Sequence, residues 1–166
     1  VNRISGETLT EMTRPQTYRE AHPRAVYLHD GVQYLVEELD LVGHRSVVVP
    51  VDQNFYTQPD VRTHIEVLVT QEMRDIALTQ GNFGDVRVDE TVVGFKMLQF
   101  HNHENLGYER LHQELKMKLE TEAVWWVVPE RVLAALGGEP RDVVRGLVHA
   151  LRAVSQLKTM AERSDL

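Results

Sequence analysis

The stretch Ala25-Val26-Tyr27-Leu28-His29-Asp30-Gly31-Val32-Gln33-Tyr34-Leu35-Val36 decides the fold class of this chain. Two runs of β-branched and aromatic residues flank Asp30-Gly31, a dipeptide that strongly favours a two-residue turn between antiparallel strands. The pattern therefore predicts a β-hairpin, with strand structure from Ala25 onward.

Further strand-like runs follow this hairpin at regular spacing. The run Ser46-Val47-Val48-Val49-Pro50-Val51 is typical of a buried strand that ends at its proline. Other runs lie at residues 64–69, 86–88, 91–99 and 119–128. Six or more short strands favour a small β-barrel or sandwich over a layered α/β domain.

Helical signals lie before and after the strands. Thr13-Arg14-Pro15 predicts a short first helix, and residues 130–136 predict another that stops at Gly137-Gly138. A longer helix opens at Glu139-Pro140, and its apolar residues recur at three- and four-residue spacing, which predicts one packing face. The residues of this face are Val144, Leu147, Val148, Leu151, Val154 and Leu157.

We therefore expect a mostly-β fold, α+β overall, in which a barrel-like or sandwich-like domain precedes C-terminal α-helices. Residues 1–23 would form a lead-in turn and short helix, residues 24–128 the β domain, and residues 129–166 the C-terminal helices.

The composition excludes several classes of protein. Of 166 residues, 42% are hydrophobic and none is cysteine, which allows a real core but excludes disulfides, thiolate catalysis and sulfur-ligated metal sites. No run approaches the roughly 18 apolar residues that span a bilayer, so we expect a cytoplasmic protein with no membrane partner. Because the first residue is Val1 rather than methionine, we expect a fragment of a longer protein.

Sequence motifs of the common enzyme classes are absent. The chain holds no Gly-rich loop ending in Gly-Lys-Ser/Thr, no Gly-x-Gly-x-x-Gly and no Gly-x-Ser-x-Gly elbow, so we expect no catalytic residue in it. His101, His103 and Glu104 carry imidazole and carboxylate groups of the kind that bind zinc. A metal hydrolase built on them is one interpretation, and a polar hairpin tip is the other.

The net charge of -7 argues against DNA binding by the chain as a whole, because phosphate contacts favour a basic surface. Local groups are therefore the candidates. Arg141, Arg145, Arg152 and Arg163 project within a narrow arc of the last helix at about 100° per residue, and such a stripe either follows phosphates or faces solvent. Tyr56 and Gln58 follow the third predicted strand in a loop, where they would contact unpaired bases or cover the end of the barrel.

Several segments resemble one known family. The first block is Tyr18-Arg19-Glu20-Ala21-His22-Pro23-Arg24-Ala25-Val26-Tyr27-Leu28-His29-Asp30-Gly31, followed by Tyr34-Leu35-Val36-Glu37-Glu38-Leu39-Asp40. Later blocks are Tyr56-Thr57-Gln58, Glu66-Val67-Leu68, Val92-Val93-Gly94-Phe95 and Thr121-Glu122-Ala123-Val124-Trp125. They are similar to the C-terminal accessory region, a domain of unknown function, of SftH/MrfA-type superfamily 2 DEAD/DEAH-box DNA helicases.

The resemblance implies a role in an ATP-dependent helicase that translocates 3′ to 5′ on DNA, in genome repair. ATP and Mg²⁺ would bind the motor domains, which this chain lacks, and those domains and DNA are the expected partners. Family members carry a four-cysteine zinc site here, but Ala161 stands where the first cysteine is expected, so no zinc ligand is assigned. The alternative from another class is a self-contained protein-interaction module without a nucleic-acid role.

Overall fold

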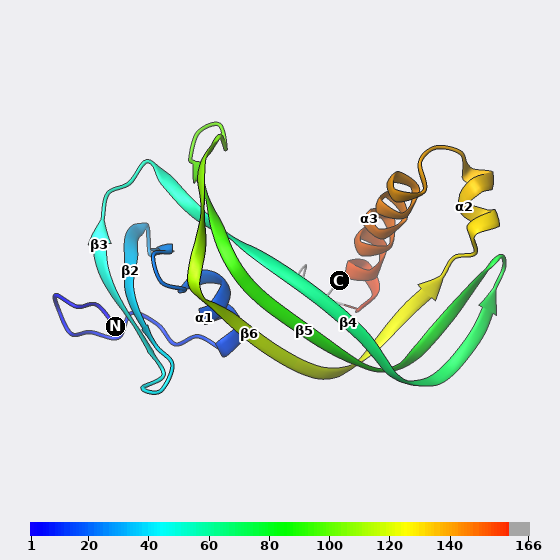
Figure 1. Cartoon of the computed structure of the whole chain (residues 1–166), viewed down its shortest axis with the longest axis horizontal. Coiled ribbons are helices and arrows are strands. Elements are labelled where there is room, and N and C mark those ends of the chain that lie inside the picture. The colour runs from blue at the N-terminus through cyan, green and yellow to red at the C-terminus, as the bar shows by residue number, and fades with distance from the viewer. Residues whose placement is uncertain (160–166) are drawn as a thin grey trace. The chain divides into compact units, whose positions relative to one another are not determined.

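The computed structural model describes residues 1–159 of the chain (Figure 1). Its elements are α1 (Arg14–Glu20), β1 (Val26–His29), β2 (Val32–Asp40), β3 (Arg45–Val51), β4 (Phe55–Ile76), β5 (Thr79–Gln99), β6 (Asn105–Val127), α2 (Glu130–Leu136) and α3 (Pro140–Thr159). The predicted mostly-β fold with C-terminal helices is confirmed. The predicted barrel is wrong, because the described strands form two open three-stranded sheets, ordered β1-β2-β3 and β4-β5-β6.

Helix α1 begins where its sequence indicates. The backbone N–H of Gln16 donates to the side chain of Thr13, the backbone N–H of Thr13 donates to the side chain of Gln16, and Pro15 lies in the first turn. This capping box satisfies two of the amide donors that the start of a helix leaves open. The buried residue of this helix is Tyr18.

The predicted hairpin at Asp30-Gly31 is confirmed. Strands β1 and β2 pair antiparallel, with His29 opposite Val32 across the turn. Asp30 has a φ of 48° and Gly31 a φ of 78°, the two positive values that a type I′ turn requires.

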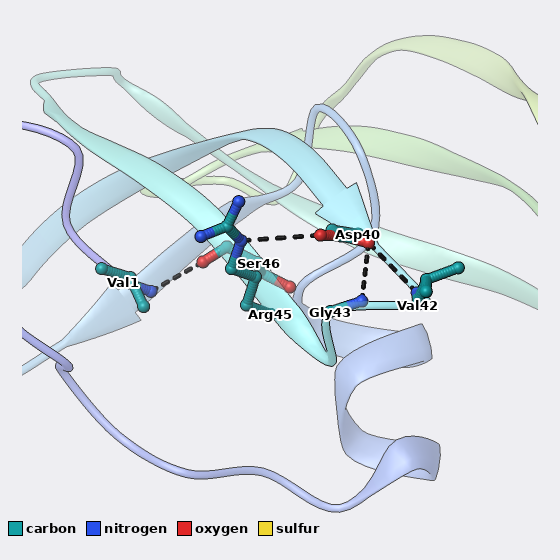
Figure 2. A network of polar contacts seen from close by, with 6 residues as sticks. All are labelled: Val1, Asp40, Val42, Gly43, Arg45 and Ser46. Atoms are coloured by element: carbon teal, nitrogen blue, oxygen red, sulfur yellow. Dashed lines mark hydrogen bonds and ion pairs between the residues drawn. The ribbon is translucent and has the colours of Figure 1, made fainter.

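The turn between β2 and β3 is held by Asp40 (Figure 2). Its carboxylate accepts hydrogen bonds from the N–H groups of Gly43 at 2.8 Å and Val42 at 3.1 Å, and it lies 3.6 Å from the guanidinium of Arg45. The hydrogen bond from Gly43 is the main reason that the pKa of Asp40 is lowered, and the other two contacts add to it. An ionised side chain therefore fixes this turn.

The second sheet contains strands much longer than predicted. Strand β4 has 22 residues, β5 has 21 and β6 has 23, and the runs predicted at 64–69, 86–88, 91–99 and 119–128 fall largely within them. The added length lies where polar and charged residues occupy exposed positions, as over much of 105–118. Such stretches lack the regular alternation of apolar and polar residues on which strand prediction relies.

The chain divides into two compact units. Unit 1 consists of Val1–Glu66 and Arg87–Thr121, and unit 2 consists of Val67–Val86 and Glu122–Leu166, of which residues up to 159 are described. Each of β4, β5 and β6 contributes residues to both units.

Unit 1 contains two clusters of buried apolar residues. One consists of Ala21, Ala25, Val36 and Val48, and lies where the chain around β1 meets β2 and β3. The other joins Tyr18 of α1 to Val92 of β5 and Leu115 of β6. Helix α1 therefore covers one face of the long sheet in this unit.

A histidine lies fully buried beside these clusters. The ring of His22 has 0% of its surface exposed and stacks on Phe95 at a centroid distance of 4.9 Å. Its Nδ1–H donates to the carbonyl of Pro23 at 3.1 Å, whereas its Nε2 has no partner among the described residues. Burial lowers the pKa of His22, which therefore favours the neutral ring.

Unit 2 leaves many apolar side chains exposed. The predicted packing face of α3 is exposed at Val144, Val148, Leu151 and Val154, so the expectation that these residues are packed is wrong, while Leu157 lies outside the described side chains. Further exposed apolar residues of this unit are Val67, Leu68, Val69, Met73, Ile76, Leu78, Val124, Trp126, Val127 and Leu136. In residues 1–159 no helix combines the length and hydropathy that crossing a membrane requires.

Candidate nucleic-acid interface

The five residues predicted to contact nucleic acid fall in two separate groups. Tyr56 and Gln58 belong to unit 1, and Arg141, Arg145 and Arg152 belong to α3 of unit 2. The predicted loop around Tyr56 is wrong, because β4 already begins at Phe55.

Tyr56 packs against the turn that joins β5 to β6. Its ring centroid lies 5.4 Å from that of Phe100, and its hydroxyl is hydrogen-bonded to Nδ1 of His103 at 3.0 Å. The ring is half-buried, so its role in holding this turn is visible in the geometry, whereas Gln58 is exposed.

Arg141, Arg145 and Arg152 are exposed, whereas Arg163 of the predicted stripe lies outside the described residues. Their spacing of four and seven residues keeps them on one side of α3, as predicted. Neither Arg141 nor Arg145 takes part in an ion pair within the described residues. A role of this stripe in binding phosphates stays a prediction.

The candidate metal ligands do not come together as a site. Within residues 1–159 no group of three or more histidine, aspartate or glutamate side chains is arranged to hold a metal ion, and His101, His103 and Glu104 form none. Ala161, at the position of the expected zinc ligand, lies outside the described residues.

A polar cluster that sequence reasoning missed lies on the long sheet of unit 1. The hydroxyl of Tyr108 on β6 donates to the carboxylate of Asp60 on β4 at 3.0 Å, although β5 lies between these two strands. The ring can cross β5 because residue 94 is glycine. A Cβ at this position would lie only 2.6 Å from the Tyr108 hydroxyl oxygen. Partial burial raises the pKa of Tyr108, and the hydrogen bond and charge of Asp60 raise it further.

The side chain of Tyr108 lies on the face of the sheet that α1 does not cover. The neighbouring Glu109 points the other way and accepts a hydrogen bond from Arg24 at 2.9 Å, in the chain segment after α1. Because side chains alternate along a strand, Tyr108 and Arg110 share the opposite face. We call this the outer face and define it by Asp60, Arg62, Gly94, Lys96, Tyr108 and Arg110.

Three cations on the outer face are exposed and have no ion-pair partner within residues 1–159. Arg62 and Arg110 lie close enough to influence the Tyr108 hydroxyl, and their charges lower its pKa against the effect of Asp60. Lys96 follows Gly94 by two residues, and it is exposed while its neighbour Phe95 is 2% exposed. None of the three has an ion-pair partner within the described part of the chain.

A sequence signal for this cluster does exist. Basic residues recur at a spacing of two in Arg62/His64 and Arg110/His112, which places each pair on one face of a strand. This spacing indicates a shared face only in an extended strand, and the alternation around these residues does not by itself predict strands.

Comparisons with known proteins agree with the resemblance seen in the sequence. No family model matches the chain. It is 28% identical over 156 residues to the uncharacterized ATP-dependent helicase YprA of Bacillus subtilis (strain 168), a match that covers 94% of this chain and 21% of the relative.

Solved structures of a helicase give the same result. The chain is similar to the DUF1998 helicase MrfA bound to DNA, with a TM-score of 0.60, 28% identity and coverage of 93% of this chain and 20% of that one. For another crystal structure of the same helicase the TM-score is 0.61, the identity 26%, and the coverage 98% and 22%. The chain thus spans about a fifth of the helicases it matches, and the predicted resemblance to part of a helicase is confirmed.

Proposed function

We propose that this chain is a non-catalytic accessory part of an ATP-dependent 3′–5′ DNA helicase, and that it packs on the motor domains and guides a DNA strand. The observation that carries the proposal is the match to YprA and MrfA, which covers nearly the whole of this chain and a fifth of each helicase. A function in DNA repair and a place in the cytoplasm are part of the same proposal.

ATP binding and hydrolysis are assigned to the rest of the parent protein. The chain holds no phosphate-binding loop of the Gly-Lys-Ser/Thr type. Four-fifths of each relative lies outside the matched region, which leaves room for two motor domains that bind ATP and Mg²⁺.

The exposed apolar residues of unit 2 are the proposed contact with those motor domains. Val144, Val148, Leu151 and Val154 form one exposed stripe on α3. Burial of such side chains contributes about 25 cal/mol per Å² of apolar surface, so a stripe of this kind favours association with another apolar surface. The motor domains are the proposed occupant, since the relatives carry about four times as much chain beside this region.

Guidance of DNA is assigned first to the predicted residues. Arg141, Arg145 and Arg152 would contact phosphates from α3, and Tyr56 and Gln58 would lie near a base. Exchange of the three arginines for glutamate is expected to lower the affinity of the chain for DNA and to make this affinity less dependent on salt concentration. Unchanged binding would mean that the stripe is only a solvated surface.

Two assays on the 166-residue chain test the proposal as a whole. No ATP hydrolysis is expected with or without DNA, and a gel-shift titration with labelled DNA is expected to show weak, salt-sensitive binding. ATP hydrolysis by the chain would contradict the accessory role. Absence of any shift at low salt would favour the protein-interaction module instead.

A further inference from the structure

We propose that the outer face of unit 1 is a binding site for single-stranded DNA, in which Tyr108 stacks a base and Arg62, Lys96 and Arg110 hold the neighbouring phosphates. The inference rests on the proposed role in DNA guidance, and it adds a site that is separate from the arginine stripe of α3.

The first argument is the fixed position of an aromatic ring. Tyr108 is 44% exposed, yet its hydroxyl is anchored on Asp60 at 3.0 Å and its ring crosses β5 above Gly94. A ring held at both ends loses little conformational entropy when a base stacks on it. Proteins that bind single strands use this combination of an exposed aromatic ring and nearby cations.

The second argument is the distribution of charge. Farther along the same strands the cations are paired, because Arg87 contacts Glu66 and Lys118 lies 3.6 Å from Asp89. Around Tyr108 the three cations lack such partners in the described residues, and Asp60 is the carboxylate that accompanies them. In an acidic chain, an unpaired basic group of this kind indicates a partner that carries negative charge.

The third argument is the shape of the face. The outer face belongs to an open sheet, and strand β5 carries Gly94 at its centre rather than a large side chain. The bases of a duplex are stacked on one another and cannot stack on a protein side chain, whereas an aromatic ring exposed on a sheet surface suits the unstacked bases of a single strand. The proposal therefore commits to a single strand.

Fluorescence anisotropy of a labelled oligonucleotide, titrated with the 166-residue chain, tests the site. The triple variant Arg62→Gln, Lys96→Gln, Arg110→Gln is expected to bind single-stranded DNA about 100-fold more weakly at 0.1 M salt, which corresponds to three phosphate contacts with a salt slope of about 0.7 each. A control with the same loss of charge combines Arg14→Gln, Arg74→Gln and Arg131→Gln, and it is expected to bind as the parent chain does.

Two further variants separate binding from folding. Asp60→Asn keeps an acceptor for the Tyr108 hydroxyl but removes a negative charge, so it is expected to bind about 5-fold more tightly, a gain that a misfolded protein cannot produce. Tyr108→Ala is expected to lose about 10-fold or more through lost stacking, whereas Tyr108→Phe is expected to stay within about 3-fold of the parent.

The outcomes distinguish this inference from the proposed function. If the helix variant Arg141→Glu, Arg145→Glu, Arg152→Glu loses binding while the outer-face variants do not, the outer face is refuted and the DNA-guiding role stands. Equal loss in the control variant, or tighter binding of duplex than of single-stranded DNA, also refutes the outer-face site. A parent chain that binds no DNA at low salt refutes both proposals.

Discussion

Replacement of Gly94 by alanine tests how closely β5 and β6 approach each other. A Cβ at this position would lie 2.3 Å from the carbonyl oxygen of Glu109 and 2.6 Å from the hydroxyl of Tyr108. The first contact is about 1 Å too short and involves backbone, so the strands must separate, at a cost of about 1–3 kcal/mol. Displacement of Tyr108 from Asp60 adds about 1 kcal/mol, which gives a total of about 2–4 kcal/mol.

Urea denaturation of the 166-residue chain measures this cost. With a slope of about 2 kcal/mol per M, the midpoint of Gly94→Ala is expected to fall by about 1–2 M. The matched control is Gly107→Ala, also in unit 1, where a Cβ would meet only the terminal methyl of Met97 at 2.8 Å. That methyl can rotate away, so the control is expected to stay within about 0.5 kcal/mol of the parent. Equal stability of the two variants would refute the proposed close approach at residue 94.

Three other outcomes follow from contacts described above. Because burial lowers the pKa of His22, this residue binds a proton more readily in the unfolded chain than in the folded one. The free energy of unfolding is therefore expected to fall as the pH drops below about 6.5, and His22 is expected not to affect it at higher pH. Urea midpoints at two pH values are expected to show a smaller drop for His22→Phe than for the parent chain, and an equal drop contradicts this. Thr13→Ala is expected to cost about 1 kcal/mol through loss of the helix cap, whereas Thr13→Ser should cost much less, and equal losses in thermal melts would speak against the cap. Metal analysis by mass spectrometry is expected to find no stoichiometric zinc in the purified chain. Ala161 stands at the position of the expected zinc ligand, and His101 and His103 belong to no metal-binding group in the described residues. One zinc ion per chain would overturn this prediction.

Local signals predicted the elements whose chemistry is local. Asp30-Gly31 determined the hairpin because the required backbone conformation depends on those two residues alone. The capping residues around Pro15 and the run at residues 130–136 likewise located α1 and α2. These elements need little information from distant parts of the chain.

The long strands and the packing of α3 were missed for the opposite reason. Between residues 105 and 118 the apolar residues that face the core are separated by Glu109 and Gln113, so no continuous apolar alternation predicts a 23-residue strand there. The apolar stripe at Val144 and Val148 correctly indicated an amphipathic helix, but periodicity does not identify the surface that covers it.

The outer face was missed because it depends on three strands at once. Tyr108 reaches Asp60 only across Gly94, and nothing local in the sequence links residues 60, 94 and 108. The stripe of Arg141 and Arg145, in contrast, follows from the period of one helix, so the sequence alone predicts it.

The way in which β4, β5 and β6 pass through both units limits how this region can be shortened. Residues 67–86 of unit 2 lie in the sequence between the two parts of unit 1, so no single cut of the polypeptide separates the units. Truncation after Thr121 would remove the end of β6 and leave part of one edge of β5 without its partner strand. Unpaired strand edges of this kind promote aggregation, so truncated versions of the chain are expected to aggregate. In evolution, the two units are therefore expected to be inserted or deleted together.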